Sequence, residues 1–571
     1  MPVRRKRAPR PARNDEPHVT LIPSLRRVRG PRAAPAPSEA APAPAAPQGP
    51  PASAAAHDPP VRPASLRQWA GVLAMVFGMF MALLDIQIVT SSLTQIQGGL
   101  SASADEISWV QTSYLIAEVV MIPLSGTLSR LMSTRVLFVA STVGFTIASA
   151  LCATATSLGA MIVFRVMQGF LGGAMIPTVF PVIYTIFPPR QLAVVMVLVS
   201  LILNLSSTVG PTVGGYLTDT YSWHWLFLVN IVPGVFVAAT VWCLIDVDKP
   251  NWSLLPAFDL PGLVLMALFL GCLEYALEEG PRWDWFSDDT ILGAAVVSAV
   301  SAGLFFWRVL TYHQPIVSLH AFRIRNFAMG SFYSFVVGIG LYCGTYIVPL
   351  FLAQVRGFSS LQIGMTVVVT GCTQICVSPF TTIIARKIDL RLMLVIGMCL
   401  FMTAMYLTAG LTNQAGFGEL LVPQMLRGVA LMFCFLPANL ISLGSLPPEL
   451  LRSSAGLYNL MRNLGGAIGL AGLGTVMNDR LHFHWNRLIE SVNPARPAVQ
   501  HFIDTQTSRF DPHFAAGGTP AAIKVLAGIV QREALVLTFN DVMLLIAGIF
   551  LIGLLMIPIL KRPGASPLKS R

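Results

Sequence analysis

The sequence predicts an all-α polytopic membrane protein with about fourteen transmembrane helices. Long apolar stretches recur from Trp69 to Leu560, and each is close to the roughly 20 residues that a helix needs to cross a hydrocarbon core about 30 Å thick. Only 11% of the residues are charged, against about 25% in soluble domains. Basic residues gather in alternate loops. A soluble enzyme is therefore not expected.

The apolar stretches give one expected helix each, joined mostly by short loops. An even number of spans returns both termini to the same side of the membrane. The expected spans are 69–92, 107–128, 135–155, 159–186, 191–217, 223–246, 259–278, 290–311, 327–354, 360–385, 391–412, 418–444, 453–477 and 537–560.

The charges of the loops predict the orientation, because cytoplasmic loops carry an excess of Lys and Arg. Loops on one side hold the basic residues Arg130, Arg135, Arg308, Arg323, Arg325, Arg386, Lys387 and Arg391. Loops on the other side hold the acidic residues Asp105, Glu106, Glu278, Glu279, Asp284, Asp288 and Asp289. We therefore expect both termini to be cytoplasmic.

Residues 1–68 read as a disordered, basic cytoplasmic tail rich in Pro and Ala. They hold 12 Lys and Arg against 4 Asp and Glu, and 16 of the 41 prolines lie in residues 1–63. Such a segment lacks the apolar residues to bury a core. Its charge directly precedes the first span, which favours contact with anionic lipid over binding to nucleic acid. No nucleic-acid partner is expected.

The spans divide the chain into an N-terminal six-helix bundle (69–246), two inserted helices (259–311) and a C-terminal six-helix bundle (327–560). Residues 478–536 are predicted to be a long external loop, and 561–571 a cytoplasmic tail. The loop holds four histidines. They are compatible with a metal site, but a solvated loop or a docking surface for a partner is favoured. The eight cysteines lie in predicted spans as small packing residues. No metal site and no disulfide framework are predicted.

Four ionisable side chains fall at membrane depth, where each is a functional hypothesis. They are Asp85, Glu118, Arg165 and Glu274. Burial favours the neutral form of a carboxyl, while a nearby guanidinium favours its charged form. A carboxylate that alternates between an arginine and a water-filled cavity can therefore load and release a proton. The alternative is a permanent ion pair that only fixes helix packing.

Two glycine-rich segments accompany these charges. In Ile162–Gly173, the residues Arg165, Gln168 and Gly169 share one helix face, where a carboxylate would find its counter-charge. In the fifth span, Val209–Gly215 concentrates glycine and proline, which suits close and bendable helix contacts. The residues of that second segment are Gly210, Pro211, Gly214 and Gly215.

With two further stretches, Ser222–Gly234 and Leu460–Gly469, these motifs make the chain resemble the fourteen-helix drug:proton antiporters of the major facilitator superfamily, the EmrB/QacA type. The resemblance covers roughly residues 69–560. It implies two six-helix bundles that rock about a central cavity, plus two inserted helices. It further implies proton-coupled efflux of drugs or other amphipathic molecules by alternating access, with Asp85, Glu118 and Arg165 coupling the proton.

The same resemblance implies a bacterial-type inner membrane and no enzyme activity. No cofactor is expected, because the proton gradient supplies the energy and no P-loop motif is present. Partners expected from the resemblance are the small-molecule substrate, membrane lipid, a HlyD-type periplasmic adaptor and an outer-membrane channel. Residues 478–536 are the candidate contact for the adaptor.

The sequence departs from the family pattern at two places. The gating loop after the second helix reads Gly126 to Arg130 with Ser129 where an acid is usual, although Arg130 and Arg135 remain. A charge lock at that loop is therefore in doubt. In the first helix, Gln87 and Thr90 stand where Thr and Asn are usual, so the surroundings of Asp85 differ.

Large aromatic side chains could bind apolar or cationic substrates, or could face lipid and neighbouring helices. The candidate cavity residues are Phe77, Phe80, Tyr114, Glu274, Tyr342 and Tyr346. Two other functions stay open. One is an exporter dedicated to a single metabolite, siderophore or toxin, and the other is a membrane receptor or scaffold with a transporter-like fold.

Overall fold

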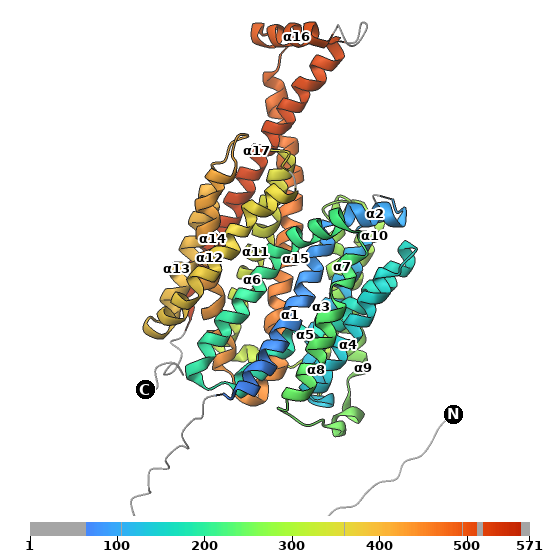
Figure 1. Ribbon diagram of the computed structural model, residues 1–571, viewed down its shortest axis with the longest axis vertical. Helices are drawn as coiled ribbons and strands as arrows, with labels where there is room; N and C mark the ends of the chain where they lie inside the picture. The colour runs from blue at the N-terminus through green and yellow to red at the C-terminus, as the bar shows by residue number, and fades with distance from the viewer. Residues whose placement is uncertain (1–63, 104–105, 359, 494, 511–517, 561–571) are drawn as a thin grey trace, which may run out of the picture. The chain divides into compact units, whose positions relative to one another are not determined.

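The computed structural model describes residues 64–103, 106–358, 360–493, 495–510 and 518–560, which contain helices and no strand. All of them belong to one compact unit, Val61–Arg571. The predictions for most of the basic tail and for the tail 561–571 fall on residues outside these ranges. Within the described residues, twelve helices are long and apolar enough to cross a membrane. The helices α6 and α15 run beside them (Figure 1). The all-α polytopic fold is therefore confirmed, and these two helices added to the twelve agree with the predicted count of about fourteen.

The N-terminal bundle begins where Ser65 caps α1 and Gln68 returns a hydrogen bond to the cap. This reciprocal capping satisfies amides that the first helical turn would leave unpaired. Short helices α2 (Leu93–Leu100) and α7 (Trp225–Leu228) connect longer ones at one end of the bundle. The spanning helices are α1 (Leu66–Ser91), α3 (Trp109–Met132), α4 (Thr134–Ala153), α5 (Leu158–Ile186), α6 (Pro189–Thr220) and α8 (Ile231–Leu244).

The C-terminal bundle repeats this pattern with longer helices. Its members are α11 (Arg325–Gln354), α12 (Ser360–Lys387), α13 (Leu390–Thr408), α14 (Phe417–Ser442), α15 (Pro448–Ser491) and α17 (Gly518–Leu555). The two bundles meet where α3 packs on α15 and where α6 packs on α12 and α14.

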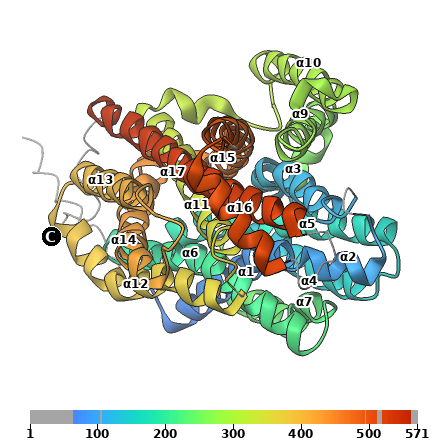
Figure 2. The same ribbon diagram turned by 90° about the horizontal axis from the view of Figure 1, so that it is seen from above.

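The inserted helices α9 (Leu260–Glu279) and α10 (Asp289–Thr311) form a pair at the outside of the bundle (Figure 2). Arg308 holds the pair together through an ion pair of 2.6 Å with Asp259, the residue that caps α9. On its other side α9 packs on both α3 and α15. The inserted pair therefore contacts both halves of the transporter fold.

The segment 478–536 is not the loop that the sequence predicted. The helix α15 continues to Ser491, α16 covers Pro497–Phe510, and α17 begins at Gly518. These pieces form a helical arm that projects beyond the other helices (Figure 1). The prediction was wrong because polar residues were read as loop, although two antiparallel helices can extend each other outside the apolar layer. We call this end of the bundle the arm end, and the end where α1 begins the tail end.

Candidate functional site

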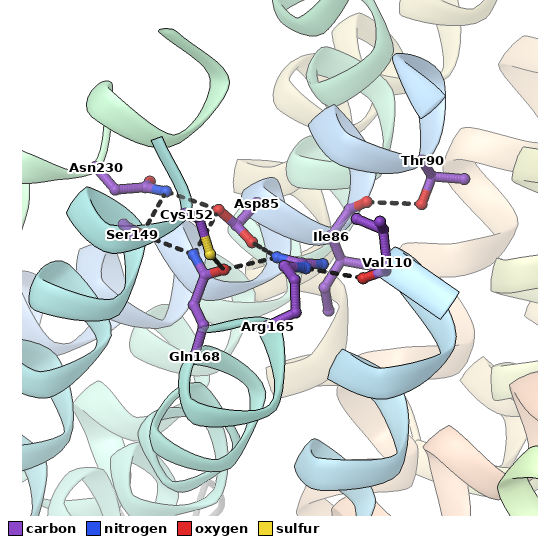
Figure 3. Close-up of polar contacts among 9 residues, drawn as sticks. All are labelled: Asp85, Ile86, Thr90, Val110, Ser149, Cys152, Arg165, Gln168 and Asn230. Atoms are coloured by element: carbon purple, nitrogen blue, oxygen red, sulfur yellow. Dashed lines mark hydrogen bonds and ion pairs between the residues drawn. The ribbon is translucent and has the colours of Figure 1, made fainter. Parts of the chain in front are cut away.

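The centre of the N-terminal bundle holds a fully buried ion pair between α1 and α5. The Nη1 atom of Arg165 lies 2.7 Å from Oδ2 of Asp85, and both side chains are 0% exposed (Figure 3). Arg165 also donates from Nη1 to Oε1 of Gln168 at 2.7 Å and from Nε to the carbonyl of Val110 at 2.9 Å. The structure thus brings two of the three predicted proton-coupling residues into direct contact.

The second oxygen of Asp85 is held by two amide side chains. Its Oδ1 accepts from Asn230 at 2.7 Å and from Gln168 at 3.0 Å (Figure 3). Gln168 donates as well to the hydroxyl of Ser149 at 2.6 Å, so four helical elements converge on this carboxylate. Sequence reasoning missed Asn230 and Ser149. The signal for Asn230 was a polar residue inside the otherwise apolar run Trp225–Gly234.

Glycines explain how α3 comes close enough to cover this pair. A Cβ atom on Gly169 would collide with the backbone of Tyr114, and one on Gly173 would lie 2.8 Å from the carbonyl of Glu118. The ring of Tyr114 consequently lies 4.2 Å beneath the guanidinium of Arg165. Such a cation–π contact is stronger where water is excluded. The Nη2 atom of Arg165 has no hydrogen-bond partner among the described residues.

Glu118 is buried one helical turn from Tyr114 but does not join the ion pair. Among the described residues it makes no ion pair and no side-chain hydrogen bond, although it lies within electrostatic reach of Arg165. Two other groups, Glu274 of α9 and Tyr342 of α11, interact electrostatically with it. The predicted trio is therefore an Asp85–Arg165 pair and a separate carboxyl at the contact between the halves.

The candidate cavity residues fall into different surroundings. Tyr114 is buried against Arg165, while Glu274 and Tyr342 lie beside Glu118. Tyr346, one turn along from Tyr342, is 46% exposed. Phe77 and Phe80 pack on each other on α1 at 5.9 Å between ring centroids, and Phe77 is 41% exposed. Of the candidates, Tyr114, Glu274 and Tyr342 interact electrostatically with Glu118.

The glycine–proline segment of α6 lies against both α1 and α12. A Cβ atom on Gly210 would collide with Cβ of Gln87, the residue that departs from the family pattern in the first helix. The neighbouring Thr212 contacts α12 at Gly364. Pro211 lies inside the helix, and the carbonyls of Gly214 and Gly215 accept from the hydroxyl of Thr218. Only a residue without a side chain fits at Gly210.

At the tail end, the predicted gating loop is not a loop, because Gly126 and Arg130 lie in the last turns of α3 and Arg135 lies in the first turn of α4. A Cβ atom on Gly126 would lie 3.0 Å from the carbonyl of Arg452 at the start of α15. Arg130 is exposed, and Arg135 lies 3.7 Å from Asp246 and 5.2 Å from the ring of Trp242. The end of α3 thus lies backbone to backbone against the C-terminal half.

The family pattern has an acidic residue where this chain has Ser129, and Asp248 provides a carboxylate at the tail end instead. Asp248, just after α8, accepts from the amide and the hydroxyl of Thr134 at the start of α4. The same carboxylate pairs with Arg452 of the other half at 2.9 Å. Sequence reasoning missed this link because Asp248 lies more than a hundred residues from the loop whose acid it replaces.

These observations define a class: a helical membrane transporter of two bundles with a buried, titratable ion pair and a charged contact between the halves. Residues 75–470 match the family model described as Major Facilitator Superfamily. The human organic anion transporter MFSD10 has the same fold, with a TM-score of 0.50 and 14% identity over 85% of this chain and 99% of that one.

Curated relatives identify the family within this superfamily. The chain is 38% identical to "Colistin resistance protein EmrB" of Acinetobacter baumannii, over 85% of this chain and 94% of that protein. It is 30% identical to "Multidrug export protein EmrB" of Escherichia coli K12, over 86% and 95%. The chain belongs to the major facilitator superfamily, and within it to the EmrB/QacA-like drug efflux permeases. It is a multi-pass protein of the inner membrane.

Proposed function

We propose that the protein exports amphipathic small molecules by proton antiport, with Asp85 as the main proton carrier. The observation that carries the proposal is the Asp85–Arg165 pair, which is wholly buried and held by neutral amide donors. A buried ion pair is stable only while both charges are present, because removal of one leaves the other unpaired at a cost of roughly 3–5 kcal/mol. Protonation of Asp85 is therefore able to select between conformations.

The proposed cycle follows from that cost. A proton from the external side neutralises Asp85, and Arg165 is left without its counter-charge beside Val110, Gln168 and Tyr114. Helices α1 and α5 then repack to a state in which the guanidinium finds new acceptors, and the substrate leaves outward. Loss of the proton toward the cytoplasm restores the pair. Glu118, which lies at the contact between halves, carries a second proton or holds a cationic substrate. No cofactor takes part, because the proton gradient supplies the energy.

The names of relatives support a broad substrate range. They include colistin resistance, multidrug export and, for a relative in Neisseria gonorrhoeae at 29% identity, fatty acid resistance. We propose drugs and other amphipathic compounds as substrates, transported from the cytoplasm outward. Both termini are assigned to the cytoplasm on the charges of the loops. This orientation places the tail end inside and the arm end outside.

We also propose the helical arm as the docking site for a HlyD-type periplasmic adaptor that leads to an outer-membrane channel. The arm projects from the external end in this orientation, and α16 bears exposed side chains along much of its length (Figure 1). Deletion of residues 497–510 should abolish resistance in cells while leaving efflux in isolated vesicles intact. Loss of both would contradict the docking role.

Dye efflux from energised vesicles tests the antiport. Wild type is compared with Asp85→Asn, Glu118→Gln and Arg165→Ala, and Asp504→Asn on the exposed face of α16 is the matched control. We expect efflux that stops when the gradient is collapsed and falls at least tenfold in the Asp85 and Arg165 variants, with normal membrane insertion. Wild-type activity in all three variants would refute the site, and efflux without a gradient would refute antiport.

A further inference from the structure

The C-terminal half contains a buried arginine that no carboxylate neutralises. Arg462, about a third of the way along α15, is 4% exposed. Its Nε and Nη2 atoms have no hydrogen-bond partner among the residues that the structure describes. No described ion pair includes it either. It thus contrasts with Arg165 of the N-terminal half, which is as deeply buried but faces Asp85.

Aromatic rings cover this guanidinium without neutralising it. The ring centroids of Phe435 and Tyr458 lie 4.6 Å and 5.6 Å from its central carbon. Cation–π contacts contribute about 0.5–2 kcal/mol each, whereas burial of an ion costs several kcal/mol even after the protein relaxes. The rings therefore offset only part of the cost. Two donor atoms of this buried cation, Nε and Nη2, remain available for an acceptor.

Arg427 shows that this is not a general property of buried arginines in this half. It is 1% exposed and also lacks a carboxylate among the described residues. However, it donates from Nη1 to the carbonyl of Gly344 and from Nη2 to the hydroxyl of Thr370. Arg427 thus joins α11, α12 and α14, while the one hydrogen-bonding side chain that Arg462 meets among the described residues is Tyr458, and its Nε and Nη2 atoms stay without a partner there.

The position of Arg462 is set by tight contacts between α15 and α11. A Cβ atom on Gly338 would collide with the carbonyl of Arg462, and one on Gly466 would collide with the ring of Tyr342. Tyr342 donates to Asn463 at 3.4 Å and interacts electrostatically with both Arg462 and Glu118. Arg462 consequently lies near the contact between the two halves, where a major facilitator fold binds its substrates.

We propose that Arg462 binds the carboxylate group of acidic amphiphiles at the contact between the halves. This inference rests on the proposed export function and names one substrate class for it. A guanidinium offers two parallel donors that match the two oxygens of a carboxylate. The rings of Phe435 and Tyr458 give the apolar part of such a molecule a flat surface. Cationic substrates would instead use Glu118 and would not need Arg462.

A matched pair of probes tests the assignment by binding to the purified full-length protein. The probes are 1-naphthoate and (1-naphthylmethyl)trimethylammonium, which share a ring system and differ in charge. We expect Arg462→Gln to weaken naphthoate binding at least tenfold and to leave the affinity for the cation within twofold. Arg462→Lys should retain part of the naphthoate affinity, since it keeps the charge without the bidentate geometry. Arg427→Gln is the control and should not change the preference between the probes.

Three results would overturn the proposal: a wild type that does not bind naphthoate, equal losses for both probes in Arg462→Gln, or an effect that disappears in a Glu118→Gln background. The last would show that Arg462 is the internal counter-charge of Glu118. Gradient-driven efflux of the cationic probe is measured in the same variants. Efflux that persists in Arg462→Gln keeps the antiport proposal independent of this result, whereas efflux that is absent in wild type refutes antiport alone.

Discussion

The link between Asp248 and Arg452 should hold the tail end closed, and its removal should open that end. The two charged groups lie 2.9 Å apart, with Asp248 5% and Arg452 37% exposed. Fully exposed pairs contribute about 0.2–1 kcal/mol, while breaking buried pairs costs about 3–5 kcal/mol. This half-buried pair falls between them, at about 1–2 kcal/mol, which is a factor of roughly 5–30 in an equilibrium. Asp248→Asn should shift the populations of the two states by that factor.

Distances between spin labels measure this shift. Labels on cysteines introduced at Ser253 and Leu392, both exposed, in a background without the native cysteines, should show a larger fraction of long distances in Asp248→Asn. Arg452→Gln should give the same shift, and the double variant no further one. Asp246→Asn is the control, because its carboxylate is 78% exposed and 3.7 Å from its partner. Unchanged distances in Asp248→Asn, or additive shifts in the double variant, would refute the reasoning.

Three further changes should act through packing and charge. Gly169→Ala should lower the free energy of unfolding by about 1–3 kcal/mol through overpacking against α3. Gly159→Ala is the control, because nothing lies within 4 Å of the added carbon. Equal melting temperatures for the two variants would contradict this prediction. Gly210→Ala should reduce efflux several-fold, and Gln87→Gly in the same chain should restore it; no restoration would mean that the collision is not the cause. Asp541→Asn should weaken the contact at the base of the arm, where the carboxylate of Asp541 lies 2.8 Å from Nε2 of His484 in α15. Proteolysis within α16 should then be faster. An unchanged rate would show that the contact does not hold the arm.

The spans could be predicted from the sequence because hydropathy and helix length are local properties. The approach of a carboxylate to Arg165 was predictable because few charges lie at membrane depth and an unpaired one is costly there. The partners of Asp85 were harder to predict. Asn230 and Ser149 are neutral and common, and only the packing of α4 and α8 shows that Asn230 donates to Asp85 while Ser149 accepts from Gln168 and Asn230.

Apart from the Asp85–Arg165 pair, contacts between distant segments could not be predicted. Asp248 substitutes for the missing acid of the gating loop across more than a hundred residues, and no local pattern marks it. Hydropathy also misled at residues 478–536, because a polar helix outside the membrane and a polar loop have the same composition. The structure resolves that ambiguity through the continuous hydrogen bonding of α15 and α17.

The unbroken length of α15 makes it a lever. Its 44 residues span about 66 Å at 1.5 Å per residue. The backbone contact with the gating loop lies near one end, Arg462 lies along the shaft, and the arm lies at the other end. A tilt of about 5° around the contact at Arg452 would displace the end of α15 at Ser491 by roughly 5 Å, since about 39 residues of helix, or about 58 Å, separate the two points. The position of α16 would therefore change with the conformation of the transporter. A protein bound to α16 would respond to that change without contacting the substrate.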